Sequence, residues 1–371
     1  MGNWKNGELG DFVTLKRGFD LPQQKREDGQ VPIFSSSGIT GTHSTAMVNA
    51  PGVITGRYGT IGEVFYAAKD FWPLNTTLFV EDFHGNDAKF IYYFLKTLEW
   101  SKFTSASAVP GINRNTVHKE TVSLPDIETQ RRIASTLSMF DEKIKINTEI
   151  NDNLEQQAQS YFQELFVDNA NPEWTTGTIS DLGAVVGGST PSKAKPEYYT
   201  ESGIAWITPK DLSINKSKFV SHGENDITEL GLKNSSAAIM PEGTVLFSSR
   251  APIGYIAIAA GEVTTNQGFK SVVPKPEIGT PFVYFFLKNT LPVIEGMASG
   301  STFKEVSGST MKNVPAVIPD AETLAKFSDF CAPIFAQQRI LEEQNQSLAT
   351  LRDNLLPKLM SGEIDVSAVQ L

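Results

Sequence analysis

The sequence predicts an α+β protein with two repeated mixed α/β domains, joined by two long helices that pair as an antiparallel coiled coil. Five sequence landmarks recur in the same order in two halves. Each half ends in a stretch with heptad spacing, and the remainder of each half is β-rich, broken by Gly, Ser, Pro and Asn. We therefore expect a first domain at 1–125, a long helix at 126–170, a second domain at 171–319 and a second long helix at 320–371.

The duplication is visible along the whole chain. Trp4-x-x-Gly7 reappears as Trp174-x-x-Gly177, and LPDIET at 124–129 is matched by IPDAET at 318–323. Between them, GRYGTIG matches SRAPIG, PLNTTLFV matches TTNQGFKSV, and FIYYFLK matches FVYFFLK (56–62 with 249–254, 73–80 with 264–272, 90–96 with 282–288). This alignment places Arg250 opposite Arg57 and Asn266 opposite Asn75. One repeated fold in two copies follows.

Each long helix has a predicted start, seam and stop. Asp126 can cap the first helix, Pro172 lies beyond its end, and Gly362 is a natural stop for the second. Asparagines on the seams can fix the register of the pair. The alternative, that each helix packs only on its own domain, stays open. The two seams are Ile133, Leu137, Phe140, Ile144, Asn147, Asn151, Leu154, Ala158, Tyr161 and Leu165, and then Phe327, Cys331, Ile334, Gln338, Leu341, Asn345, Leu348, Arg352, Leu355 and Leu359.

Composition indicates a soluble globular protein. Hydrophobic residues make up 40% of the chain and charged residues 20%, and there is one cysteine, Cys331. The start lacks the apolar run of a signal peptide, so we expect a cytoplasmic protein. The net charge is −10, but residues 1–125 carry 12 basic and 12 acidic side chains, and 171–319 carry 12 and 13. The acidity therefore belongs mainly to the helical stretches, and either domain can bind DNA if its basic groups share one face.

The sequence contains little that suggests catalysis. It has no phosphate-binding loop and no G-x-G-x-x-G fingerprint. Four histidines are scattered without metal-ligand spacing (His43, His84, His118, His222), and PDIE and PDAE are better interpreted as helix starts than as carboxylate sites. We therefore expect a protein that is not an enzyme and that has no metal site.

Arg57 and Tyr58 are the first candidate binding residues. They stand among the glycines of GRYGTIG, where the backbone can approach another surface and an arginine can reach a phosphate or a guanine edge. Arg250 is the candidate of the second half. A tight strand-to-strand turn, with Arg57 paired to an internal carboxylate, explains the motif equally well.

Two polar loops supply the other candidates. SSSGITGTHS at 35–44 offers small donors at Ser35, Ser36, Ser37 and Thr40, and we take GGSTPSKAKPEYYTESG at 187–203 as its counterpart. For any single residue, a solvated loop remains the simpler interpretation. The remaining DNA-binding candidates are Asn75, Lys193, Lys195, Tyr198 and Asn266.

These strings together resemble the specificity subunits of Type I restriction-modification systems. The resemblance covers essentially the whole chain and includes SSSGITG, GRYGTIG, GGSTPSKAKPEYY, IAWITPKDL, PDIETQRRIASTL and LRDNLLPKLMSGEI. It implies two target-recognition domains that each read half of a bipartite double-stranded DNA site, and helices that set the spacer and dock modification (methyltransferase) subunits. S-adenosylmethionine and ATP would then bind only to the modification and restriction subunits. A scaffold that bridges two proteins without touching DNA is the alternative.

Overall fold

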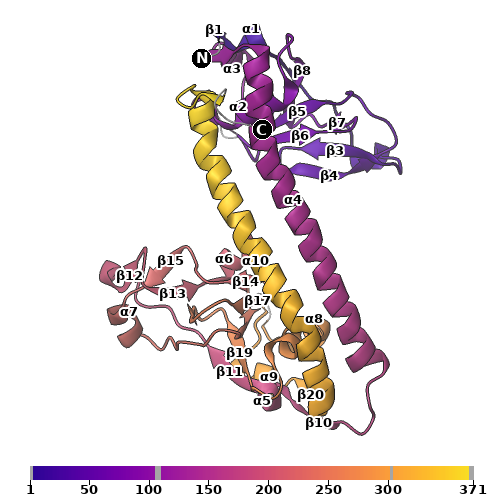
Figure 1. Ribbon diagram of the computed structural model, residues 1–371, viewed down its shortest axis with the longest axis vertical. Coiled ribbons are helices and arrows are strands. Elements are labelled where there is room, and N and C mark those ends of the chain that lie inside the picture. Colours follow the sequence, from indigo (N-terminus) through magenta and orange to yellow (C-terminus); the bar gives the residue numbers. More distant parts are fainter. Residues whose placement is uncertain (1–2, 105–109, 301–303, 367–371) are drawn as a thin grey trace. The chain divides into compact units, whose positions relative to one another are not determined.

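The computed structural model describes residues 3–104, 110–300 and 304–366, and the chain divides into two compact units. Unit 1 comprises Met1–Lys145 with Gln346–Leu371, and unit 2 comprises Ile146–Asn345. The two long helices, α4 (Ile127–Gln163) and α10 (Ala321–Met360), each contribute to both units (Figure 1). The predicted boundaries between domains and separate spacer helices stay a prediction. Within the described ranges, no helix is long and apolar enough to cross a membrane.

Unit 1 holds three small antiparallel or mixed sheets and short helices. Strands β2, β8, β5 and β6 form the main sheet in that order, β4, β3 and β7 form a second sheet, and β1 pairs with β9. The strands are β1 (Trp4–Glu8), β2 (Thr14–Arg17), β3 (Val31–Ser35), β4 (Gly38–His43), β5 (Gly52–Gly56), β6 (Val64–Ala67), β7 (Trp72–Pro73), β8 (Thr77–Asp82) and β9 (Thr121–Pro125). The helices besides α4 and α10 are α1 (Leu9–Phe12), η1 (Gln23–Lys25), α2 (Ala88–Lys96), η2 (Trp100–Phe103) and α3 (Arg114–His118).

Unit 2 repeats this plan with additions. Its main sheet has the order β11, β19, β16, β17 and β14, its second sheet the order β12, β15, β13 and β18, and β10 pairs with β20. The strands are β10 (Thr175–Thr178), β11 (Gly183–Gly187), β12 (Tyr199–Thr200), β13 (Ile204–Ile207), β14 (Phe219–Val220), β15 (Asn225–Ile227), β16 (Val245–Ser249), β17 (Ile253–Ala259), β18 (Thr264–Thr265), β19 (Lys270–Pro274) and β20 (Pro315–Ile318). The helices are η3 (Glu164–Asp168, a π-helix), α5 (Ile179–Leu182), η4 (Pro196–Tyr198), α6 (Pro209–Ile214), α7 (Glu229–Lys233), α8 (Thr280–Met297) and α9 (Gly308–Lys312).

The sheet orders confirm the predicted duplication and the α+β class. The order β2-β8-β5-β6 of unit 1 becomes β11-β19-β16-β17 in unit 2, and the β1·β9 pair becomes β10·β20. The second sheets share a parallel pairing, β3 with β7 and β13 with β18. Each of these matches joins segments that are equally placed in the two halves of the sequence.

The ends of the long helices form as the sequence predicts. Asp126 and Asp320 each accept a hydrogen bond from the backbone N–H three residues later, at 2.9 and 2.8 Å. Helix α10 ends at Met360, and Gly362 adopts φ +75°, a conformation that favours glycine. A side chain at Gly362 would also meet the Trp4 ring at 2.9 Å. The chain therefore has to turn away from the helix at this glycine.

The two helices pair in antiparallel fashion, and all predicted seam residues are buried or half-buried. In unit 2, Asn147 Nδ2 donates to Asn345 Oδ1 at 2.9 Å, and Gln338 Nε2 donates to the Asn151 carbonyl at 3.2 Å. In unit 1, Arg352 forms an ion pair with Asp141 at 2.6 Å. The polar residues that interrupt the seam therefore bond across it, which ties specific partners together and opposes register slips.

Each helix also packs on the cores of both units, so packing on one domain alone is not what the structure shows. Helix α4 contributes Ile133 and Leu137 to the core of unit 1 and Ala158 and Phe162 to the core of unit 2. Helix α10 does the same in reverse order, with Phe327, Cys331, Ile334 and Phe335 in unit 2 and Leu359 and Met360 in unit 1. The aromatic helices α2 and α8 lie in these same cores, as predicted, with Phe90, Tyr93, Phe282 and Phe285 almost fully buried. They are therefore core elements and not stacking platforms.

His118 at the end of α3 makes the stability of unit 1 depend on pH. Its Nε2 accepts a hydrogen bond from the Leu15 N–H at 2.9 Å, and burial, with the nearby charges of Arg114 and His84, lowers its pKa. As the pH falls below about 6.5, the unfolded chain takes up this proton first, so the free energy of unfolding falls. We expect His118→Gln to weaken this loss between pH 7 and 5.5, as measured by urea denaturation at both pH values. Identical pH dependence in the variant and the parent would refute the assignment.

Candidate DNA interface

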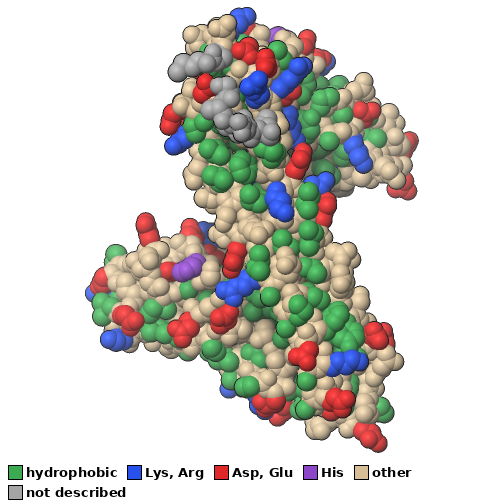
Figure 2. Space-filling view, in the orientation of Figure 1, with side chains coloured by type: hydrophobic (Ala, Val, Ile, Leu, Met, Phe, Trp, Pro, Cys, Tyr) green, Lys and Arg blue, Asp and Glu red, His purple; other side chains and the backbone are tan. Residues whose placement is uncertain are grey.

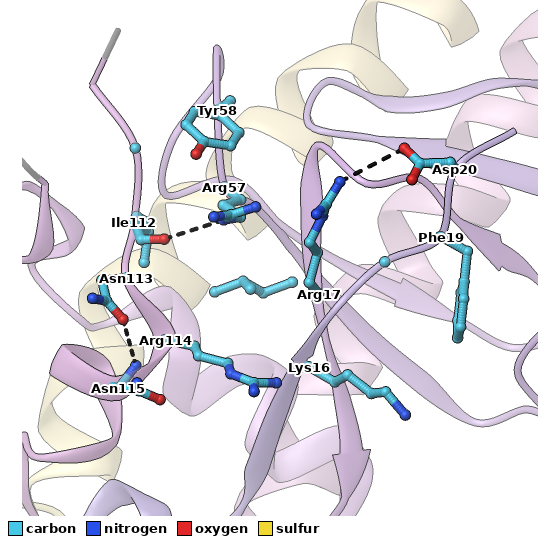
Figure 3. Close-up of a pocket in the computed structure, with 13 residues that line it drawn as sticks. Lys16, Arg17, Phe19, Asp20, Arg57, Tyr58, Ile112, Asn113, Arg114 and Asn115 are labelled. Carbon is cyan, nitrogen blue, oxygen red and sulfur yellow. Dashed lines mark hydrogen bonds and ion pairs between the residues drawn. The ribbon is translucent and has the colours of Figure 1, made fainter. Parts of the chain in front are cut away.

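A basic hollow of unit 1 lies where β2, the β5–β6 loop and the start of α3 converge (Figure 3). We call it site 1. It is an open pocket of about 710 Å³. Its lining residues are Lys16, Arg17, Gly18, Phe19, Asp20, Arg57, Tyr58, Leu78, Gly111, Ile112, Asn113, Arg114 and Asn115.

Two backbone hydrogen bonds fix the position of Arg57 at the pocket. The Arg57 N–H donates to the Thr76 carbonyl at 2.9 Å, and the Arg57 carbonyl accepts from the Ile112 N–H at 3.0 Å. Its side chain lies over the Tyr58 ring, 4.6 Å from the ring centroid, and its Nε donates to the Ile112 carbonyl at 3.4 Å. Because Nε and the stacked face are engaged, the two terminal nitrogens remain directed into the pocket.

Three further cations complete the pocket. Lys16 and Arg17 end strand β2, and Arg114 is the first residue of α3, which Asn113 caps by accepting from the Asn115 N–H at 3.0 Å. Figure 3 shows the side chains of Arg57 and Arg114 pointing toward the strand that carries Arg17. Site 1 is thus lined by four cations from three separate segments, of which Lys16 forms an ion pair with Glu81 outside the lining.

A single acidic residue lines site 1. Asp20 lies 3.6 Å from Arg17, and both side chains are more than half exposed, so this ion pair contributes little energy. Among the described residues no ion pair joins Arg57 to a carboxylate, but its contacts with Ile112 and Tyr58 fit the alternative of a turn that serves the fold. On the face drawn in Figure 2, basic and acidic side chains are interspersed within each unit. The excess of positive charge in site 1 is therefore local.

The structure brings several predicted residues of unit 1 close to site 1. A Cβ built at Gly56 would lie 3.2 Å from Ser36 Cβ, so the turn after β3 touches the loop that carries Arg57 and Tyr58. Asn75 donates to Asp20, at the edge of the pocket. Ser35 and Ser37 bond to each other at 3.0 Å, in the same turn. Thr40 is exposed on β4 and does not line the pocket.

Equivalent hydrogen bonds show that Ser249, and not Arg250, occupies the position of Arg57. The Ser249 N–H donates to the Gly268 carbonyl at 2.7 Å, and the Ser249 carbonyl accepts from the Val306 N–H at 2.9 Å, as Arg57 does with Thr76 and Ile112. The alignment that placed Arg250 opposite Arg57 is therefore wrong by one residue, because SRAPIG is shorter than GRYGTIG. Arg250 corresponds to Tyr58.

Equivalent backbone contacts also correct two other pairings between the halves of the sequence. The Asn266 N–H donates to the Ile207 carbonyl at 3.0 Å as the Leu74 N–H does to Phe34 at 2.8 Å, so Asn266 corresponds to Leu74. The counterpart of Asn75 is Gln267, which accepts from Thr190. Strand β3 pairs with β7 as β13 pairs with β18, so β3 and β13 are equivalent strands. The serine turn 35–37 follows β3 and therefore corresponds to residues 208–210, which follow β13. It does not correspond to the loop 187–203.

Aligned in this way, unit 2 has a site at the same place with a different charge pattern. We call it site 2 and define it by Arg250, Lys270 and Glu305, next to an open pocket of about 740 Å³ that Arg250 and Glu305 line. Strand register places Lys270 opposite Gly187 where unit 1 has Leu78 opposite Arg17. The arginines of site 1 thus have uncharged counterparts, since Arg17 corresponds to Gly187, Arg57 to Ser249 and Arg114 to Gly308. The charged residues of site 2 likewise have uncharged counterparts, since Arg250 corresponds to Tyr58, Lys270 to Leu78 and Glu305 to Gly111.

The other predicted residues of unit 2 lie in different surroundings. Lys193 and Asn266 line a polar pocket of about 390 Å³ together with Trp206 and Lys210. Lys195 is exposed and lies 3.8 Å from Glu197. Tyr198 is half-buried, and its carbonyl accepts from the Thr228 N–H at 3.0 Å, which supports the start of α7. All DNA contacts assigned to these residues stay predictions.

The sequence interpretation missed Lys16, Arg17, Arg114, Lys270 and Glu305. A search for matching letters in the two halves passes over them, because at each of these positions the other half has an uncharged residue. The available signals were their charge and, for Lys16, Arg17 and Arg114, the nearby glycines (KRG at 16–18, GINR at 111–114).

Comparison with known proteins gives a consistent picture. The family model described as Type I restriction modification DNA specificity domain matches residues 1–156 and 171–351. The MjaIX specificity subunit of Methanocaldococcus jannaschii is 39% identical over 194 residues, which are 50% of this chain and 45% of that relative. The HindI specificity subunit of Haemophilus influenzae is 24% identical over 347 residues, with 72% of this chain and 75% of the relative covered.

A solved structure supports the fold. The Type I restriction-modification S subunit from M. genitalium matches with a TM-score of 0.64 and 19% identity, over 96% of each chain. Its likeness extends over both units, and the family model matches both halves of the sequence separately. We conclude that the chain belongs to the Type I restriction modification DNA specificity domain family and is, as the sequence predicted, a specificity subunit and not a catalytic one.

Proposed function

We propose that the chain reads a bipartite double-stranded DNA site, with site 1 in unit 1 serving one block of bases and site 2 with the polar pocket of unit 2 serving the other. The observation that carries this proposal is that Arg17, Arg57 and Arg114, from three separate segments, line one open pocket. Lysine and arginine neutralise phosphates, and the planar arginine fork also fits the O6 and N7 atoms of guanine. The different charge patterns of the two sites suit the reading of two different sequences.

The paired helices would set the distance between the two blocks. Seam bonds such as Asn147 to Asn345 oppose sliding of one helix along the other, and a helix rises 1.5 Å per residue, so a fixed register gives a fixed length. The same helices would dock two modification subunits, which bring S-adenosylmethionine, and in some complexes restriction subunits, which bring ATP. Ile146 and Ile150 on α4 are 50% and 40% exposed and lie one turn apart, which suits contact with a partner helix.

A map of methylated adenines in the host genome, with and without this gene, tests the proposed function. We expect methylation to disappear at one split motif, two short blocks separated by a constant gap, because the modification subunits would lose their guide. Reintroduction of the gene should restore it. Methylation that is unchanged by the deletion would contradict the proposal and favour a scaffold that bridges two proteins.

A further inference from the structure

Two cations of site 2 converge on one carboxylate. Arg250 Nη1 lies 3.4 Å from one carboxylate oxygen of Glu305, and Lys270 Nζ lies 3.8 Å from the other. The Arg250 and Glu305 side chains are 39% and 38% exposed at the mouth of the pocket. Lys304 and a second carboxylate, that of Glu295, also line this pocket. The geometry is that of an anion site whose anion belongs to the protein itself.

Lys270 is built into this site and does not reach it by chance. Its side chain is 16% exposed, its stem passes over Gly187 and Gly308, and its Nζ donates to the Gln267 carbonyl at 3.3 Å. Burial lowers the pKa of Lys270, with Glu305 acting in the opposite sense. An ammonium group in such a place is incompletely solvated and gains from a strong anionic partner.

Backbone hydrogen bonds also hold Glu305 in place. The Glu305 N–H donates to the Ser299 carbonyl at 2.9 Å, and the Ser299 N–H donates to the Glu305 carbonyl at 3.1 Å. In unit 1 the corresponding residue is Gly111, where any side chain would collide with the Tyr58 ring at 2.2 Å. Unit 1 therefore has no carboxylate at this position, and its ion pairs lie elsewhere, between Arg17 and Asp20 and between Lys16 and Glu81, whereas unit 2 supplies Glu305.

We propose that Arg250 and Lys270 bind one backbone phosphate of DNA, and that Glu305 occupies this anion site until DNA displaces it. A phosphodiester carries one negative charge shared over two non-bridging oxygens, as a carboxylate does over its own two, and can replace a carboxylate between the same two cations. Because DNA must first displace Glu305, unit 2 binds DNA of any sequence less tightly. Contacts to the bases then decide which sequence stays bound. This inference rests on the proposed function, since it requires unit 2 to bind DNA.

The test measures binding of the full chain to a fluorescent duplex that carries the split motif found in the methylation map. We expect Glu305→Gln to bind about fivefold more tightly, because a half-exposed ion pair no longer competes. The slope of log affinity against log salt should change by less than about 0.9, the value for one phosphate contact, because the parent and the variant bind the same phosphate. The double variant Arg250→Gln/Glu305→Gln should lose this gain.

Glu242→Gln is the matched control. Glu242 pairs with Arg339 at 2.5 Å in the same unit, so the substitution removes the same charge from an ion pair outside site 2. Equal affinities of the Glu305→Gln and Glu242→Gln proteins, or weaker binding by Glu305→Gln, would overturn the inference alone. Failure of the parent protein to bind the duplex at any salt concentration would overturn the proposed function and this inference with it.

Discussion

Replacement of Arg57 and Arg114 together by alanine is expected to lower the affinity of the chain for its DNA site about 100-fold, or about 2.7 kcal/mol. Both residues direct guanidinium groups into site 1, and Arg57 has no carboxylate partner among the described residues. Each would lose contacts to a phosphate or a guanine edge, which contribute about 1–3 kcal/mol apiece. Fluorescence anisotropy against duplexes altered in one block at a time would show the loss and assign it to one block.

Two comparison variants make this result interpretable. Lys69→Ala/Arg131→Ala removes two exposed cations of unit 1 that do not line site 1, so it should change affinity by less than about threefold. Arg57→Lys/Arg114→Lys keeps the charge and removes the planar fork, so recovery of affinity indicates phosphate contacts and continued loss indicates guanine contacts. An equal loss in the control pair and the site 1 pair would remove site 1 from the DNA interface.

The repeated framework of this protein could be predicted from the sequence because it is written in residues that both halves retain. Buried aromatics such as Phe90 and Phe282, and helix caps such as Asp126 and Asp320, serve the same packing and hydrogen-bonding needs in each copy. The heptad seams were equally visible, since burial along a helix leaves a periodic pattern. Fold class and the antiparallel helix pair followed from these features.

The sites could not be found in the same way, because they are built where the halves differ. Arg17 and Arg114 stand opposite Gly187 and Gly308, so comparison of the halves does not mark them. One missing residue in SRAPIG also shifted the match of Arg57 onto Arg250, which only backbone hydrogen bonds could correct. A one-residue shift in a turn between strands changes which side chains share a pocket, and letter matching does not detect it.

Replacement of Lys218 by methionine is expected to lower the free energy of unfolding by about 3 kcal/mol. Lys218 is 6% exposed, and its Nζ lies 2.8 Å from Glu155 on α4, 2.9 Å from Gln338 on α10 and 3.5 Å from the centroid of the Phe335 ring. Removal of the ammonium leaves Glu155, a half-buried carboxylate, with Lys288 as its remaining cation. Urea denaturation would measure the loss, and amide exchange at 150–160 would locate it in unit 2.

The double variant Lys218→Met/Glu155→Gln separates the ion pair from simple packing. It removes both charges, so its loss should be smaller than the sum of the two single losses by about 1 kcal/mol or more. Additive losses would mean that the two side chains do not stabilise each other, although they lie 2.8 Å apart. The single variant would then be destabilised by packing alone.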